Sequence, residues 1–267
     1  MKILPKIYTA LVFVFLYAPI VVLILFSFNS TNSTGVFEGF SLYWYRELFS
    51  NSNALSALKN TLILATLSAV ISCIIGTAAA TGIVKFRRRA IKSSILSVTN
   101  IPMMNPDIVT GISMMLLFVF IGRTLGFANN LSFWTLLIAH ITFNIPYVIL
   151  NVMPKFYQMD DHLPEAAMDL GCTPLKSFFL VELPSILPGV LSGFIMAFTL
   201  SLDDFIISHF TTSGFETLPI FIYSMTKKKV KPDMYALSTL IFVAILVLLI
   251  LSNVIQAQGE KKNKKSK

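Results

Sequence analysis

Charged residues are scarce in this sequence. Only 13% of its 267 residues are Asp, Glu, Lys or Arg, whereas 55% are hydrophobic, and the mean hydropathy is +0.75. A soluble globular domain carries roughly twice that share of charged residues, and a disordered chain has far less apolar surface. The composition therefore excludes both classes and indicates an integral membrane protein.

Cysteine is almost absent as well. Cys73 lies inside an apolar run and Cys172 in a polar segment, so neither a disulfide nor a cysteine metal site is predicted. The sequence also lacks a nucleophile elbow, an HExxH motif and a phosphate-cradling glycine loop. We therefore predict that the chain is not an enzyme and binds no cofactor or metal. If the chain takes part in an energy-requiring process, a source outside this chain must supply the free energy.

Six apolar runs are each long enough to cross roughly 30 Å of hydrocarbon as a helix. They are Ile7–Phe28, Thr61–Val84, Ile95–Ile121, Phe133–Val152, Leu187–Phe210 and Met234–Ile255. The predicted fold is an all-α integral membrane protein with six transmembrane helices. The second run carries small residues at helical spacing, which predicts close packing against other helices of the same chain; these are Ala65, Ala69, Ser72, Gly76 and Ala80.

The basic residues predict the orientation. If the N-terminus lies inside the cell, 14 lysines and arginines fall on the cytoplasmic side and 7 on the outer side. The positive-inside rule then places both termini in the cytoplasm of a multi-pass bacterial cell-membrane protein. The net charge of +8 reflects these flanks and contact with membrane lipid, and no nucleic-acid partner is predicted. The outer stretch Lys227–Lys231 is the exception to the rule.

A polar segment, residues 153–184, separates the fourth run from the fifth. It holds the acids Asp160, Asp161, Glu165, Asp169 and Glu182. Ionised groups are costly in lipid, so the segment must emerge into water. Its pattern predicts one short helix over Leu163–Leu170 and a second over Leu175–Leu183, joined at Gly171 and ended by Pro184, with Thr173 and Pro174 starting the second helix. Such a segment is either a solvated loop or a structure that docks into a partner.

The segment EAAMDLGCTPLKSFFLVELP, from Glu165 to Pro184, resembles the EAA loop of permease subunits in type I ABC importers. The resemblance implies a MetI-like fold and two cytoplasmic helices that seat in the ATP-hydrolysing subunit. The residues that carry it are Glu165, Ala166, Ala167, Gly171, Leu183 and Pro184. Their chemistry suits docking, because alanines permit close approach, glycine permits a sharp reversal and glutamate supplies a charged anchor.

Three acids, Asp107, Asp203 and Asp204, lie inside predicted spans that contain no lysine or arginine. Intramembrane acids usually face a bundle interior or a wet cavity. Asp107 follows Asn105 and Pro106, so the third helix is predicted to break there. Carboxylates without basic partners suit a cation, and a polyamine fits well because aromatic rings can cover its methylenes. The candidate aromatics are Trp44, Phe205 and Tyr223. Alternatively, an aspartate caps a broken helix.

Further stretches resemble the PotC-type permeases of spermidine/putrescine importers. They are NPDIVTGIS, LLIAHITFNIPYV, FTLSLDDFIISHF and LPIFIYSM. The resemblance implies a system with a sister permease, a cytoplasmic ATPase dimer that binds ATP, and an extracytoplasmic polyamine-binding protein. We divide the chain into 1–56, an N-terminal helix and outer segment; 57–256, the permease core with its loop at 153–184; and 257–267, a basic tail.

Three alternatives stay open. The first alternative is a permease for another cation or organic solute. The second is an ion-coupled secondary carrier in which Asp107 and Asp203 shuttle protons or sodium ions. A secondary carrier would show two matching halves with paired broken helices, and the sequence predicts one break. A membrane-embedded enzyme using His140 and Asp107 lacks any motif.

Overall fold

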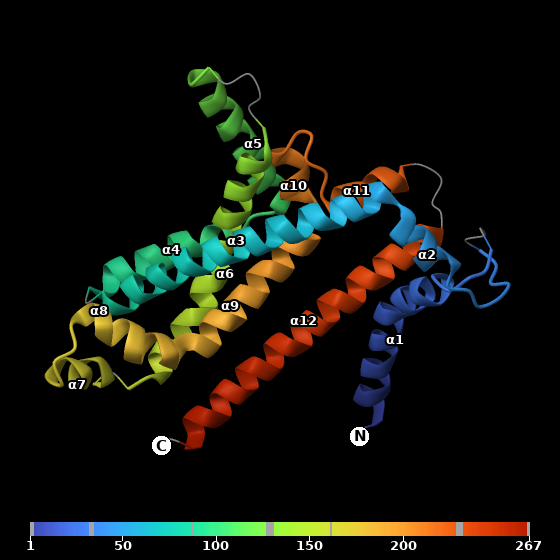
Figure 1. The fold of residues 1–267 in the computed structure, drawn as a ribbon. Helices are drawn as coiled ribbons and strands as arrows, with labels where there is room; N and C mark the ends of the chain where they lie inside the picture. Colours follow the sequence, from blue (N-terminus) through green and yellow to red (C-terminus); the bar gives the residue numbers. More distant parts are fainter. Residues whose placement is uncertain are drawn as a thin grey trace. The chain divides into compact units, whose positions relative to one another are not determined.

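The computed structural model describes residues 3–31, 35–86, 88–126, 131–160, 162–227 and 232–265 (Figure 1). Within these ranges the chain is helical, and its only β contact is an isolated bridge between Asn29 and Phe40. The helices are α1 (Ile3–Phe26), α2 (Tyr43–Ser50), α3 (Ser52–Lys85), α4 (Arg89–Met104), α5 (Asp107–Thr124), α6 (Phe133–Gln158), α7 (Leu163–Asp169), α8 (Pro174–Ser177), the π-helical turn η1 (Phe178–Glu182), α9 (Leu183–Asp203), α10 (Ile206–Thr211), α11 (Leu218–Thr226) and α12 (Pro232–Lys265).

Among the described residues, six helical segments are long and apolar enough to cross a membrane, which confirms the predicted number. They are Pro5–Phe26, Ser52–Lys85, Asp107–Thr124, Phe133–Gln158, Pro174–Asp203 and Asp233–Leu251. Four of them match the predicted runs with shifted ends. The third and fifth predicted runs are each interrupted and do not form one continuous helix.

The predicted third span, Ile95–Ile121, is not one continuous helix, and the predicted break within it is confirmed. The chain is interrupted at Asn105 and Pro106, as the proline predicts, and forms α4 before the break and α5 after it. Only α5 qualifies as a membrane-spanning segment. Asp107 is therefore the first residue of that span and does not lie in its interior.

The predicted fifth span, Leu187–Phe210, is wrong as one helix. Helix α9 ends at Asp203, Asp204 and Phe205 leave the helical ladder, and α10 begins at Ile206. At its other end the span begins earlier than predicted, because α8, η1 and α9 follow one another without a break from Pro174.

The chain packs as two units, and each is described by itself. The first comprises residues 1–58 and 220–246, and the second comprises residues 59–219 and 247–267. In the first unit, the side chain of Asn29 organises the segment after α1: its Nδ2 donates to the Val36 carbonyl at 2.7 Å and its Oδ1 accepts from the Glu38 amide at 3.0 Å. Trp44 Nε1 donates to the Asn29 carbonyl at 2.8 Å, which fixes α2 onto this segment.

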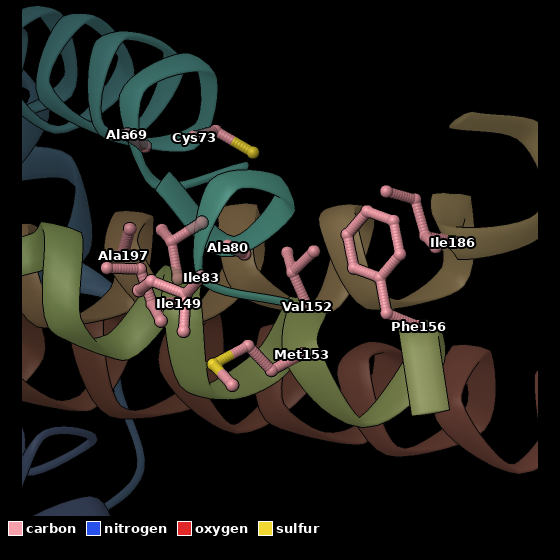
Figure 2. Packing of buried hydrophobic residues seen from close by; sticks show 11 residues of the cluster. Ala69, Cys73, Ala80, Ile83, Ile149, Val152, Met153, Phe156, Ile186 and Ala197 are labelled. Carbon is pink, nitrogen blue, oxygen red and sulfur yellow. The ribbon is translucent and has the colours of Figure 1, made fainter. Parts of the chain in front are cut away.

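The second unit is built around α3, α6 and α9. Figure 2 shows their shared apolar core, with Ala69, Cys73 and Ala80 of α3 facing Ile149, Val152 and Phe156 of α6 and Ile186 and Ala197 of α9. The predicted small-residue face of α3 is buried here, which confirms internal helix packing. The backbones approach closely, because a Cβ built on Gly76 would lie 2.7 Å from Val148 Cβ.

Candidate functional site

The polar segment folds into a compact pair of short helices, α7 and α8, which we call the polar hairpin (residues 162–177). Gly171 adopts φ +88°, so it can end α7 in a left-handed turn that other residues adopt only at a cost. The amides of Gly171 and Cys172 donate to the carbonyls of Met168 and Ala167, the pattern of a Schellman motif. The predicted reversal at Gly171 is confirmed.

The second helix of the hairpin starts as its sequence predicts. Thr173 is the N-cap, its hydroxyl accepting from the Lys176 amide at 3.3 Å, and Pro174 takes the first helical position. The hydroxyl of Ser177 donates to the Pro164 carbonyl at 3.2 Å. Because this bond joins α8 to α7, the hairpin is fixed internally.

The EAA residues differ in exposure. Glu165 has a side chain that is 70% exposed and lies 3.4 Å from His162 Nδ1. Ala166 is exposed, whereas Ala167 is buried within the hairpin. Several large apolar side chains are also exposed on this part of the chain; they are Leu163, Met168, Leu170, Leu175, Phe179 and Leu180. An exposed apolar surface with a charged anchor is typical of a protein-docking site.

The predicted end of the second helix at Pro184 is wrong. The helix continues through η1 into α9, and the Leu183 amide donates to the Phe178 carbonyl, the i to i−5 bond of a π-helical turn. Pro184 lies in the first turn of α9, where its missing N–H costs little. Within η1, Glu182 is buried and its Oε1 lies 2.8 Å from Lys85 Nζ at the end of α3. The two residues are 97 positions apart, and no local pattern in the sequence predicts that they pair.

The three predicted intramembrane acids lie at the two helix breaks. Asp107 begins α5, Asp203 ends α9, and Asp204 precedes α10. One turn after Asp107, a Cβ on Gly111 would lie 3.5 Å from the Ile206 carbonyl, so α5 and α10 pack closely. Asp203 consequently lies within electrostatic range of both Asp107 and Asp204. Tyr147 of α6 lies within range of Asp107, a neighbour that the sequence analysis missed.

Asp203 and Asp204 have different surroundings. Asp203 is exposed. Asp204 is nearly buried, and its carboxylate accepts hydrogen bonds from the amides of Ile207 at 3.3 Å and Ser208 at 2.8 Å, so it caps the first turn of α10 from the position before the N-cap residue Phe205. Asp204 therefore has the helix-capping role that was the alternative to cargo contact. His140 Nε2 lies 3.0 Å from Ser208 Oγ and 3.5 Å from Asp204 Oδ2, which ties the cap to α6.

Of the three candidate aromatics, Phe205 belongs to the same unit as the acids and lies between α9 and α10. Trp44 and Tyr223 belong to the first unit, whereas the three acids belong to the second. Trp44 is buried and holds the segment after α1. Tyr223 is 40% exposed, and Lys227 Nζ lies 4.5 Å from its ring centroid. Lys228, Lys229 and Lys231, of the stretch Lys227–Lys231, lie outside the described residues.

The six candidate spans and the polar hairpin between the fourth and fifth indicate an integral membrane protein with a structured connection in water. Residues 72–265 match the family of binding-protein-dependent transport system inner membrane components, and the chain belongs to that family. It is thus a multi-pass membrane protein with the type I ABC importer permease fold, and its relatives are transport permease subunits.

Two relatives and one solved structure support the assignment. The putrescine transport system permease protein PotI of Escherichia coli strain K12 is 38% identical over 93% of this chain and 89% of its own. The spermidine/putrescine transport system permease protein PotC of the same strain is 37% identical over 94% of this chain and 93% of its own. A chain of a bacterial alginate-importing ABC transporter superposes with a TM-score of 0.69 at 13% identity, covering 97% of this chain and 95% of that one.

Proposed function

We propose that this chain forms half of the translocation pathway of an ATP-driven polyamine importer. One observation carries the choice of cargo: Asp107, Asp203 and Asp204 gather at two helix breaks, and the sequence has no lysine or arginine from 93 to 122 or from 177 to 226. Such a site attracts spaced ammonium groups and repels anions. The names of the two relatives support the same cargo.

The other half of the pathway is a sister permease subunit, and the cargo arrives on an extracytoplasmic polyamine-binding protein. A partner ATPase dimer binds and hydrolyses ATP, and this chain needs no cofactor. Both termini lie in the cytoplasm, in keeping with the positive-inside rule. The polar hairpin then faces the ATPase, and its exposed apolar side chains and Glu165 form the docking surface.

Reconstitution tests the proposal. The chain, its sister permease, the ATPase and the binding protein are purified and placed in proteoliposomes, and uptake of labelled spermidine and putrescine is measured. We expect uptake that requires ATP and all four components. Spermidine uptake by this chain alone in ATP-free vesicles would instead establish a secondary carrier. ATP-dependent uptake of a different cation, with none of either polyamine, would establish a permease for another solute.

Docking through the hairpin is tested at Ala166. Because Ala166 is exposed, Ala166→Arg adds bulk and charge to the surface without disturbing the interior of the hairpin. We expect the ATPase to be lost from the purified complex. Ser213→Arg is the matched control, an exposed position in the turn after α10. Ala167→Arg is less informative, because Ala167 is buried and the hairpin itself would be distorted. Full retention of the ATPase by Ala166→Arg would contradict docking at this surface.

A further inference from the structure

We propose that the ion pair between Lys85 and Glu182 links the polar hairpin to α3, so that movement of the hairpin is passed to the membrane-spanning helices. Lys85 is the last residue of α3 and Glu182 the last residue of η1, 97 positions later in sequence. The inference rests on the proposed coupling role of the hairpin and assigns the residues that carry its movement onward. Both are positioning residues.

Burial distinguishes this pair from an ordinary surface salt bridge. The Glu182 side chain is only 2% exposed, whereas that of Lys85 is 56% exposed. Lysine at the C-terminal end of a helix is stabilised by the helix dipole, so Lys85 is a ready source of positive charge. A buried carboxylate is costly unless it is paired. Glu182 therefore depends on Lys85.

The pair is not optimised for stability. Glu182 Oε1 is bonded to Lys85, but no group of the described residues is hydrogen-bonded to the buried Oε2. Replacing both partners of such a half-satisfied buried pair by apolar side chains is often neutral or stabilising for a fold. A buried polar atom of this kind points to a role other than stability.

The pair also lies between the polar hairpin and the membrane-spanning helices, where a movement of the hairpin would reach those helices. On one side of it is the hairpin, held together by the Schellman turn at Gly171 and the bond between Ser177 and Pro164. The π-helical turn has one residue more per turn than an α-helix and recurs at functional positions. Without a second attachment, the hairpin would act on the spans only through α9 and the chain that leads back to α6.

On the other side of the pair, α3 is packed tightly along its length. Gly76 contacts Val148 of α6, the Cys73 thiol donates to the Val190 carbonyl of α9, and Ser68 Oγ lies 2.9 Å from Ser201 Oγ of α9. Ser201 is two residues before Asp203. A displacement at Lys85 would therefore be carried by a rigid helix to the neighbourhood of the acid cluster, whose breaks are the deformable points.

The experiment separates coupling from folding in the reconstituted four-component importer. ATP hydrolysis, polyamine uptake and ATPase co-purification are measured for Glu182→Gln, for the apolar double variant Lys85→Met with Glu182→Met, and for the charge swap Lys85→Glu with Glu182→Lys. Glu182→Gln and the apolar double variant should keep the ATPase and hydrolyse ATP. Each should take up about tenfold less polyamine per ATP hydrolysed. The charge swap should restore uptake.

A pair that only stabilises the fold predicts the opposite for the apolar double variant. Since that variant leaves no buried unpaired charge, its uptake per ATP would equal that of the unmodified protein, and the proposal would be overturned. Failure of the charge swap to restore uptake in a folded complex would also overturn it. Lys92→Met is the control: it removes a lysine that lies over the Tyr157 ring at 4.9 Å, and the transport ratio should not change.

The proposed function fails in a distinguishable way. If the unmodified importer shows no ATP-dependent polyamine uptake, or the unmodified chain does not retain the ATPase, the function itself is wrong. If the unmodified importer works and the Lys85 and Glu182 variants match it, only the inference about the pair is wrong.

Discussion

Asp203 and Asp204 are adjacent in sequence, yet their side chains have different exposures and different hydrogen-bond partners. Asp204 accepts two backbone amides at the start of α10 and lies next to buried His140, so its charge is used within the protein. Asp203 is exposed and lies in the field of Asp107. At the scale of single residues, Asp204 shapes the helix break, and Asp203 is the acid that we propose for contact with the cargo.

Matched substitutions test this division. Asp203→Asn is expected to lower polyamine uptake roughly tenfold, through loss of a charge-assisted contact, with an unchanged melting temperature. Asp204→Asn is expected to lower the free energy of unfolding by about 1 kcal/mol, because the cap loses its charge beside the α10 N-terminus. Melting of the purified permease and uptake in proteoliposomes measure the two effects. The reverse pattern, a stability loss for Asp203→Asn alone, would contradict the division.

At the scale of helices, close approach of backbones holds the second unit together. Gly189 of α9 packs against α6, where a Cβ would lie 2.7 Å from Lys155 Cγ and 2.8 Å from the Asn151 carbonyl oxygen. The second distance is to backbone, which cannot move aside cheaply. Gly82 of α3 offers a contrast, since a Cβ there would meet nothing within 4 Å. The two glycines are alike in sequence terms and differ only in their surroundings.

The contrast gives a prediction for helix packing. Gly189→Ala is expected to destabilise the permease by about 1–3 kcal/mol, because the added methyl group forces α6 and α9 apart. Gly82→Ala is expected to be neutral, or to stabilise by up to about 1 kcal/mol, since alanine favours a helix over glycine. Thermal unfolding in detergent compares them. Equal effects of the two substitutions would show that backbone proximity does not govern this interface.

Local signals in the sequence predicted the local features correctly. The glycine at 171, the cap at Thr173 and the break at Pro106 each act through the backbone of their own residues, so they could be recognised without the fold. The break at Asp204 has no proline or glycine. It depends on the carboxylate that caps α10 and on His140 of another helix, and contacts of that kind are not visible in one segment of sequence.

Pro184 shows the limit of a local rule. Proline ends a helix when it falls in the interior but fits the first turn, and only the π-helical turn before it makes Pro184 a first-turn residue. The pairing of Lys85 with Glu182 was equally hidden, since the two residues are 97 positions apart. Tertiary packing decides both features.

At the scale of the whole molecule, the hairpin and the acid cluster lie at opposite ends of α9. This helix has 21 residues, about 30 Å, which is close to the hydrocarbon thickness of a bilayer. By the positive-inside rule, the end of α9 whose neighbouring connections carry the excess of lysine and arginine is expected to face the cytoplasm, and this is the hairpin end. The coupling proposal depends on this orientation, because an ATPase can reach the hairpin only from inside the cell.

The native cysteines allow the orientation to be measured. Cys172 lies in the hairpin and is partly exposed, whereas Cys73 is buried. A membrane-impermeant maleimide is expected to label Cys172 in inside-out vesicles and not in intact spheroplasts. Ser213→Cys, made in a Cys172→Ser background, places the thiol in the exposed turn beyond α10 and is expected to show the reverse pattern. Labelling of Cys172 only from outside would place the hairpin out of reach of the ATPase, and the coupling mechanism would have to be abandoned.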